Sequence, residues 1–108
     1  MRFLIAYAVP VIVILLSIPL VLGKVRPNPL YGFRTPKTMS SPDIWYPANK
    51  AAGILMIVAA MLSIVVNSVL LMLSAGWPDP TLFRLMSASS VVPLLLSLVG
   101  SFLYLRRL

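Results

Sequence analysis

The chain has 108 residues, of which 60% are apolar and 10% are charged, and its formal net charge is +7. Soluble domains carry about 25% charged residues, so this composition cannot cover a surface exposed to water and instead indicates a small membrane protein. Cysteine and histidine are both absent, which excludes disulfides, thiolate metal sites and catalysis by a thiol or an imidazole.

The first apolar stretch covers residues 3–22. It is long enough to cross a hydrocarbon core of about 30 Å, which takes about 20 helical residues. A basic start followed by an apolar run also describes a secretory signal peptide, but such apolar cores have about 7 to 15 residues and end at a small-residue cleavage site. This stretch is longer, carries Pro10 and Pro19, and ends in LVLGKVR without an A-x-A pattern. We therefore expect a retained membrane helix.

A polar connection over residues 23–50 interrupts the apolar sequence, and we expect the specific work of the protein to be done there. Near its end, Ser41 can cap a helix, Pro42 suits the first helical position, and Asp43 complements the positive helix end. Because Pro47 follows soon afterwards, the pattern predicts either a short interfacial helix or a kinked entrance to the next span.

Two further spans are predicted, over residues 51–74 and 85–105. The connection between them contains glycine, two prolines and an aspartate, which is turn chemistry, and Trp77 is expected to anchor it at the membrane interface. The fold class is therefore an all-α integral membrane protein. Residues 1–108 are expected to form one membrane domain of three transmembrane helices.

Small and polar side chains form one stripe on each of these two spans. They are Ala59, Ser63 and Asn67 on the second span, and Ser89, Pro93, Ser97 and Ser101 on the third. Residues spaced by four share a helix face, and small side chains let two helices approach and form hydrogen bonds, so the stripes should face each other. Asn67 and Ser63 are the candidate polar residues inside the membrane, and packing is the favoured interpretation over a ligand site.

The distribution of Lys and Arg predicts the orientation of the chain. Seven of them lie in the first connection and at the C-terminus, against Arg2 and Arg84 on the other side: Lys24, Arg26, Arg34, Lys37, Lys50, Arg106 and Arg107. Cations flanking spans favour the cytoplasmic side. The protein is thus expected in the cell membrane as a multi-pass protein, with its N-terminus outside and the connection 23–50 and the C-terminus in the cytoplasm.

The residue inventory argues against an enzyme. Asp43 and Asp79 are the only carboxylates and are predicted on opposite sides of the membrane, so they cannot form an acid and base pair. Serines have no histidine to activate them, and Lys50 is the only base near one. No catalytic residue, metal or cofactor is predicted. Because the cations flank apolar spans, contact with membrane lipids explains them better than binding to nucleic acid.

The remaining class of function is recognition of another molecule by the polar connection. Arg34, with Thr35, Lys37 and Thr38, offers guanidinium, ammonium and hydroxyl donors, the set that binds phosphate or carboxylate groups. An Arg34 that is buried and satisfies carbonyls of its own loop fits the pattern equally well. The candidate binding residues are Tyr31, Gly32, Phe33, Arg34, Thr35, Pro36, Lys37, Trp45, Asn49 and Lys50.

The same segment resembles the SdpI/YfhL family of bacterial membrane proteins. That family has a G-[FIY]-R-T-P loop, then a serine-led turn and W-x-x-A-[NH]-[RK] at the start of a helix with small residues. The matching residues are Gly32, Phe33, Arg34, Thr35, Pro36, Trp45, Ala48, Asn49, Lys50 and Gly53. The resemblance implies immunity against a secreted, membrane-active peptide toxin, together with signalling through a cytoplasmic repressor.

Two alternatives to the immunity role stay open from the sequence. One is a structural membrane module, with a homo-oligomer as one form, whose loop binds anionic lipid head groups. The other is a subunit of a small-molecule transporter, which three short spans could serve only as an oligomer.

Overall fold

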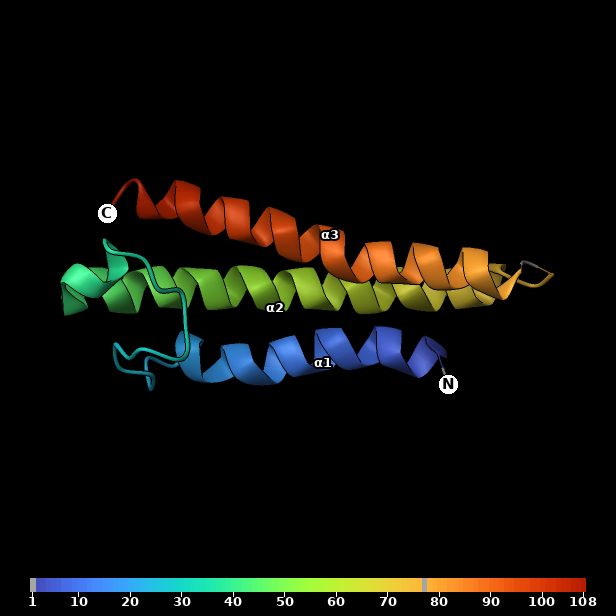
Figure 1. Ribbon diagram of the computed structural model, residues 1–108, viewed down its shortest axis with the longest axis horizontal. Helices are drawn as coiled ribbons and strands as arrows, with labels where there is room; N and C mark the ends of the chain where they lie inside the picture. The colour runs from blue at the N-terminus through green and yellow to red at the C-terminus, as the bar shows by residue number, and fades with distance from the viewer. Residues whose placement is uncertain (1, 77) are drawn as a thin grey trace.

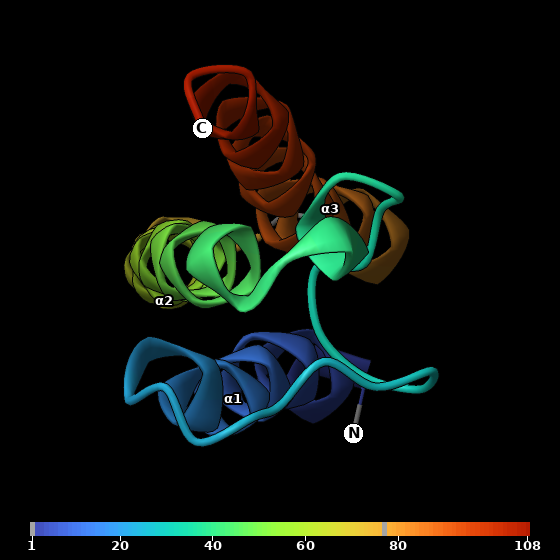
Figure 2. The ribbon, with the colours of Figure 1, turned by 90° about the vertical axis from the view of Figure 1, so that its left-hand side faces the viewer.

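The structure is a computed structural model that describes residues 2–76 and 78–108, so the predicted anchor Trp77 lies outside the described residues. The described residues form helices and connections, which confirms the all-α class. In chain order the elements are helix α1 (Arg2–Val21), the short 3₁₀ helix η1 (Thr38–Ser40), helix α2 (Pro42–Leu73) and helix α3 (Asp79–Leu105). Successive α-helices run in opposite directions, and α2 packs against both of the others (Figures 1 and 2).

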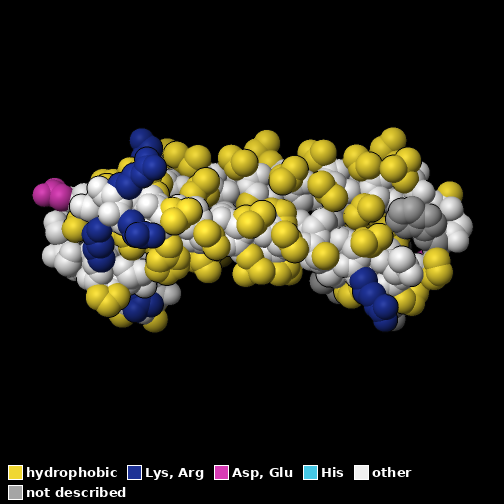
Figure 3. Space-filling model, turned by 90° about the horizontal axis from the view of Figure 1, so that it is seen from above, with side chains coloured by type: hydrophobic (Ala, Val, Ile, Leu, Met, Phe, Trp, Pro, Cys, Tyr) yellow, Lys and Arg dark blue, Asp and Glu magenta, His cyan; other side chains and the backbone are white. Residues whose placement is uncertain are grey.

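The bundle is long and narrow, with principal extents of 53 × 22 × 19 Å. Helices α2 and α3 are long and apolar enough to cross a membrane, while α1 contributes a shorter apolar stretch, Ala6–Val21. The 32 residues of α2 span about 48 Å, more than a hydrocarbon core of about 30 Å. Large apolar side chains such as Leu15 and Leu96 are exposed. Figure 3 shows apolar side chains over the middle of one face and Lys and Arg toward both ends, a surface suited to hydrocarbon.

Helix α2 starts at Pro42, well before the predicted span 51–74. Ser41 is its N-cap, because the Ser41 hydroxyl accepts a hydrogen bond of 3.1 Å from the backbone N–H of Asp43. Of the two alternatives at Pro47, a separate short helix is wrong, since α2 continues through this residue into the second predicted span. Proline at this position deprives only the carbonyl of Asp43 of its helical partner, and Asp43 is an exposed residue near the helix start.

The predicted separate interfacial helix is replaced by η1 and the first turns of α2. Helix α3 also starts earlier than expected, at Asp79 rather than near residue 85, because Pro80 occupies one of its first two positions, where no N–H is needed. The connection from α2 is correspondingly short, and Gly76 turns it with a φ of 84°. Asp43 and Asp79, at the starts of α2 and α3, therefore lie at opposite ends of the bundle (Figure 1).

Helix α1 approaches α2 closely at Gly53. A Cβ atom added to Gly53 would lie 2.8 Å from Val21 Cγ2 and 3.1 Å from the backbone oxygen of Ser17. Only glycine leaves room for this contact, which explains why a small residue stands at the predicted helix start.

The polar stripes of α2 and α3 meet at Ser63, Asn67 and Ser89, whereas Ser97 and Ser101 form their hydrogen bonds within α3. The Ser63 hydroxyl donates to the carbonyl oxygen of Ser89 at 2.5 Å, and the Ser89 hydroxyl donates to Asn67 Oδ1. Asn67 Nδ2 lies 3.4 Å from both Ser90 Oγ and the carbonyl oxygen of Ala6 in α1. The fully buried amide of Asn67 thus joins all three helices.

Replacing Asn67 by leucine is expected to lower the free energy of unfolding by about 1 kcal/mol, the usual value of an interhelical hydrogen bond in membrane proteins. Thermal unfolding in detergent measures the change. Val65→Leu, an exposed position on the same helix, is the control and should behave as the parent. An Asn67→Leu variant more stable than the parent would contradict the packing role.

Candidate functional site

The connection between α1 and α2 folds back over one end of the bundle. We call residues 31–38 the strap, because this segment passes from the side of α1 toward α3 before α2 begins (Figure 2). Helix α3 leans away from α1 toward this end (Figure 1). At the other end α1 and α3 meet directly in a small apolar cluster of Ala6, Leu82 and Met86. The strap therefore covers the open end of a wedge between α1 and α3.

Asn49 fastens the strap to α2. Its Oδ1 accepts a hydrogen bond of 2.6 Å from the N–H of Phe33, and its Nδ2 donates to the carbonyl oxygens of Phe33 at 3.3 Å and Trp45 at 3.0 Å. Both the amide and Phe33 are buried. Asn49 therefore supplies the hydrogen bonds that the backbone of Phe33 would otherwise have to form with water.

Gly32 and Trp45 bring the strap into contact with α2. Gly32 has a φ of 111°, and a Cβ atom there would lie 2.9 Å from Asn49 Oδ1 and 3.1 Å from the ring of Trp45. The indole of Trp45 is fully buried, and its N–H donates to the carbonyl oxygen of Val25 at 2.8 Å. The glycine is needed for both its conformation and its lack of a side chain.

Two contacts fasten the strap to α3. The rings of Phe33 and Phe102 meet edge to face, with centroids 5.1 Å apart. Lys37 Nζ donates to the carbonyl oxygen of Leu105 at 2.8 Å, in the last turn of α3, where a cation also complements the helix dipole. Lys37, predicted as an anion-binding residue, is thus occupied by the scaffold.

Between these attachments the strap contains a tight turn around Pro36. The Thr38 hydroxyl accepts from the N–H of Thr35 at 2.7 Å and lies 3.1 Å from its carbonyl oxygen, while the Thr35 hydroxyl accepts from the N–H of Thr38 at 3.1 Å. Thr38 is fully buried. Thr38 was predicted as a hydroxyl donor for an anion, but its hydroxyl is used within this turn, of which two threonines flanking Pro-Lys are a signal.

Arg34 differs from its neighbours in the strap. It is exposed and makes no hydrogen bond or ion pair with the part of the chain that the structure describes. The alternative in which Arg34 is buried and bonded to loop carbonyls is therefore wrong, because Asn49 has that position. The guanidinium is left available to another molecule.

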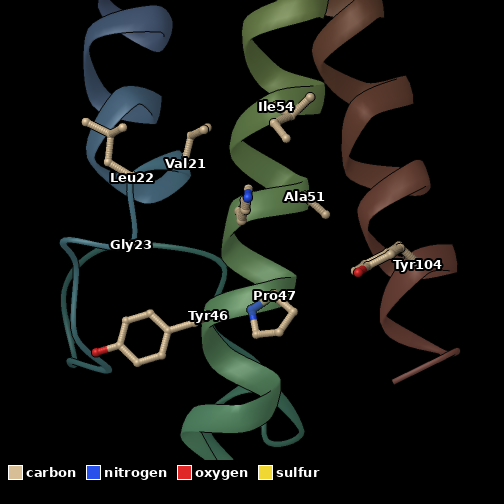
Figure 4. A pocket seen from close by; sticks show the side chains of 9 residues that line it. Val21, Leu22, Gly23, Tyr46, Pro47, Ala51, Ile54 and Tyr104 are labelled. Carbon is tan, nitrogen blue, oxygen red and sulfur yellow. The ribbon is translucent and has the colours of Figure 1, made fainter.

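Lys50 lies apart from Arg34. It borders a broad depression of about 620 Å³ on the opposite face of α2, where Figure 4 shows Tyr104 of α3 and the end of α1 on either side of that helix. The predicted binding residues are therefore not one cluster: Asn49 and Trp45 are buried supports, while Lys50 and Arg34 face different surfaces.

A cavity of about 580 Å³ lies beneath the strap, between α1, α2 and α3. Gly32, Phe33, Arg34 and Thr35 of the strap line one side of it. A smaller cavity of about 160 Å³ shares Val13, Gly32 and Met56 with it and is also lined by Tyr31.

The Tyr31 hydroxyl is buried and bonds to none of the residues that the structure describes. Burial raises the pKa of Tyr31 above its ordinary value, so the phenol stays protonated and remains a hydrogen-bond donor at physiological pH. The backbone around it is shaped by Asn28, whose Oδ1 accepts from the N–H groups of Leu30 at 2.9 Å and Tyr31 at 2.7 Å. Asn28 was not predicted, although Asn between two prolines is typical of turns.

These features define the class: a small helical protein of membrane type with a fixed polar strap across one end. The family model described as the SdpI/YfhL protein family matches residues 24–104, which include the strap and all of α2, and the chain belongs to this family. No curated protein and no solved structure is significantly similar to the chain.

Proposed function

We propose that this protein is an immunity protein of the SdpI type, which spans the membrane three times and recognises a membrane-active peptide toxin through Arg34. The observation that carries the proposal is the state of Arg34: it is exposed and unpaired among the described residues, on a strap that Phe33 and Lys37 attach to the helices. Because the backbone of the strap is already fixed on either side of Arg34, only the arginine side chain has to be ordered when it binds a carboxylate or phosphate.

The proposed orientation puts the N-terminus outside and the strap and the C-terminus in the cytoplasm. Lys24, Arg26, Arg34 and Lys37 precede α2, and Arg106 and Arg107 follow α3 at the same end, which supports a cytoplasmic location. In this orientation the strap can also meet a cytoplasmic repressor.

Reporter fusions test the orientation. A cytoplasmic reporter fused after residue 108 should be active and a periplasmic reporter inactive, whereas a fusion in the connection between α2 and α3 should give the opposite result. Periplasmic activity at residue 108 would contradict the proposed topology.

Protection from toxin tests the role of Arg34. Sensitive cells that express the protein should survive a panel of membrane-active peptides better than cells without it, and Arg34→Ala should abolish the protection. Arg34→Lys should be nearly as poor, because an ammonium cannot form a planar, two-pronged bond with a carboxylate. Arg26→Ala, which removes an exposed cation from the same connection, is the matched control and should protect as the parent does.

Membrane levels and thermal stability of each variant separate recognition from folding. Loss of protection by Arg34→Ala at unchanged stability supports the proposal. Protection by Arg34→Ala equal to that of the parent would reject it, and absence of protection in every variant, the parent included, would favour a structural module.

A further inference from the structure

We propose that the cavity beneath the strap holds one acyl chain of an anionic phospholipid, with the phosphate of the head group at Arg34. This inference rests on the proposed membrane location of the bundle, and it uses the same guanidinium that is proposed to recognise the toxin. Its occupant follows from the shape of the cavity, the chemistry of its walls and the single charge on its border.

The shape of the cavity sets it apart from the ordinary lipid-facing surface. Val13 of α1, Met56 of α2, and Leu94, Leu98 and Phe102 of α3 form its walls, and the strap lies across one side. Its volume of about 580 Å³ falls within the range of about 300–1,000 Å³ that is typical of small-molecule sites. Three helices and the strap can therefore contact a chain that elsewhere would touch one helix face, while the exposed Leu98 and Phe102 leave the cavity open on one side.

The walls offer hydrocarbon rather than hydrogen bonds. Apart from Arg34 and Thr35, the polar side chains in the lining are Ser97 and Ser101. The Ser97 hydroxyl donates to the carbonyl oxygen of Leu94 at 2.7 Å, and the Ser101 hydroxyl donates to that of Ser97 at 2.8 Å. With both donors used inside α3, the depth of the cavity suits an apolar chain and not a polar molecule.

The border of the cavity carries the complementary charge. Arg34 lines it, is exposed, and has no ionic partner among the described residues. Arginine at a membrane interface binds phosphate with parallel hydrogen bonds, and anionic lipids concentrate at the cytoplasmic surface where the strap is proposed to lie. An anionic phospholipid combines the chain and the charge in one molecule.

A second polar group points to the same ligand. Tyr31 lines the adjoining smaller cavity, and its buried hydroxyl lacks an acceptor in the described chain. Ester and phosphate oxygens of a lipid are acceptors, and a buried donor left without one is unfavourable. Tyr31→Phe should therefore lower the affinity for lipid without lowering the thermal stability of the lipid-free protein.

The affinity test uses the full chain in detergent, with bound lipid counted by native mass spectrometry. Phosphatidylglycerol should bind about tenfold more tightly than phosphatidylcholine with the same chains, the difference expected from one charge-assisted contact. Arg34→Ala should remove this preference, and Arg26→Ala should keep it. Inorganic phosphate should not displace the lipid, since it lacks the chain; displacement by phosphate at the same concentration would overturn the assignment of the chain to the site.

Blocking the cavity tests the position of the chain. Val13→Phe adds a ring at the cavity wall and should lower the affinity for both lipids. Val11 is exposed on the same helix and lies outside the lining, so Val11→Phe should leave both affinities unchanged. Equal binding by these two variants would overturn the proposal.

A measurement on the protein without substitutions tests the same proposal and does not require any variant to fold. Phosphatidylglycerol with a diazirine on its acyl chain should label peptides that contain Val13, Met56 or Leu98 in preference to the other faces of the helices. Labelling spread equally over all helix faces would overturn the proposal. So would labelling of these positions by a membrane-active peptide that carries a diazirine, if added phosphatidylglycerol did not reduce that labelling.

Discussion

Replacing Asn49 by alanine is expected to release the strap from α2 and to lower the free energy of unfolding by about 3 kcal/mol. The change leaves the buried N–H and carbonyl of Phe33 without the side chain that pairs both of them. A buried polar group without a partner costs about 1–3 kcal/mol, so two such groups account for the expected loss.

Thermal unfolding in detergent gives the stability, and limited trypsin digestion reports on the strap itself. Cleavage after Arg34 and Lys37 should become faster in Asn49→Ala than in the parent. Lys50→Ala, the next residue on the same helix but exposed, is the matched control and should alter the unfolding temperature little. If the two variants have the same stability and digestion rate, Asn49 does not hold the strap.

Replacing Gly32 by alanine should cost about 2–4 kcal/mol. A side chain at its φ of 111° is strained by about 1–3 kcal/mol, and the new Cβ would stand 2.9 Å from Asn49 Oδ1, so the bond to Phe33 is strained as well. Gly23 provides a matched comparison, because it also has a positive φ, of 70°, but has no atom within 4 Å of an added Cβ.

Gly32→Ala combines crowding by Trp45 and Asn49 with a φ of 111° that lies outside the left-handed helical region, whereas the φ of 70° at Gly23 lies within it. Unfolding temperatures in the same detergent should fall clearly further for Gly32→Ala. Equal decreases would mean that the contact with Trp45 and Asn49 is loose enough to admit a methyl group.

Much of the fold was predictable because its signals are local. Apolar stretches longer than a membrane core predict helices, and the run Ser41, Pro42 and Asp43 marks the start of α2 at the residue where the structure begins it. The four-residue stripes correctly paired α2 with α3 through Ser63 and Asn67.

The errors in the fold come from proline. Pro47 and Pro80 were interpreted as breaks, but both stand close to a helix start, where the missing N–H removes at most one bond. The sequence does not show how near to a helix start a proline will be, because the start is fixed partly by tertiary contacts.

The candidate site was harder to predict, because its residues act over long separations. Asn49 was predicted to bind a ligand, yet its partner is the backbone of Phe33, and Lys37 caps a helix that ends far along the chain. No local pattern distinguishes an asparagine or lysine that fastens a loop from one that meets a ligand. Among the strap's predicted cations, Lys37 is used by the scaffold and Arg34 is left for an external anion.

The bond from Lys37 to Leu105 also has a consequence for the order in which the protein is made. It joins residues 68 positions apart, so the ribosome must complete α3 before the strap receives this attachment. While only α1 and α2 have been synthesised, the residues of the strap are present but lack their support on α3. The strap therefore reaches its final conformation only after α3 has been made. A nascent chain, or one that ends before Leu105, lacks this attachment.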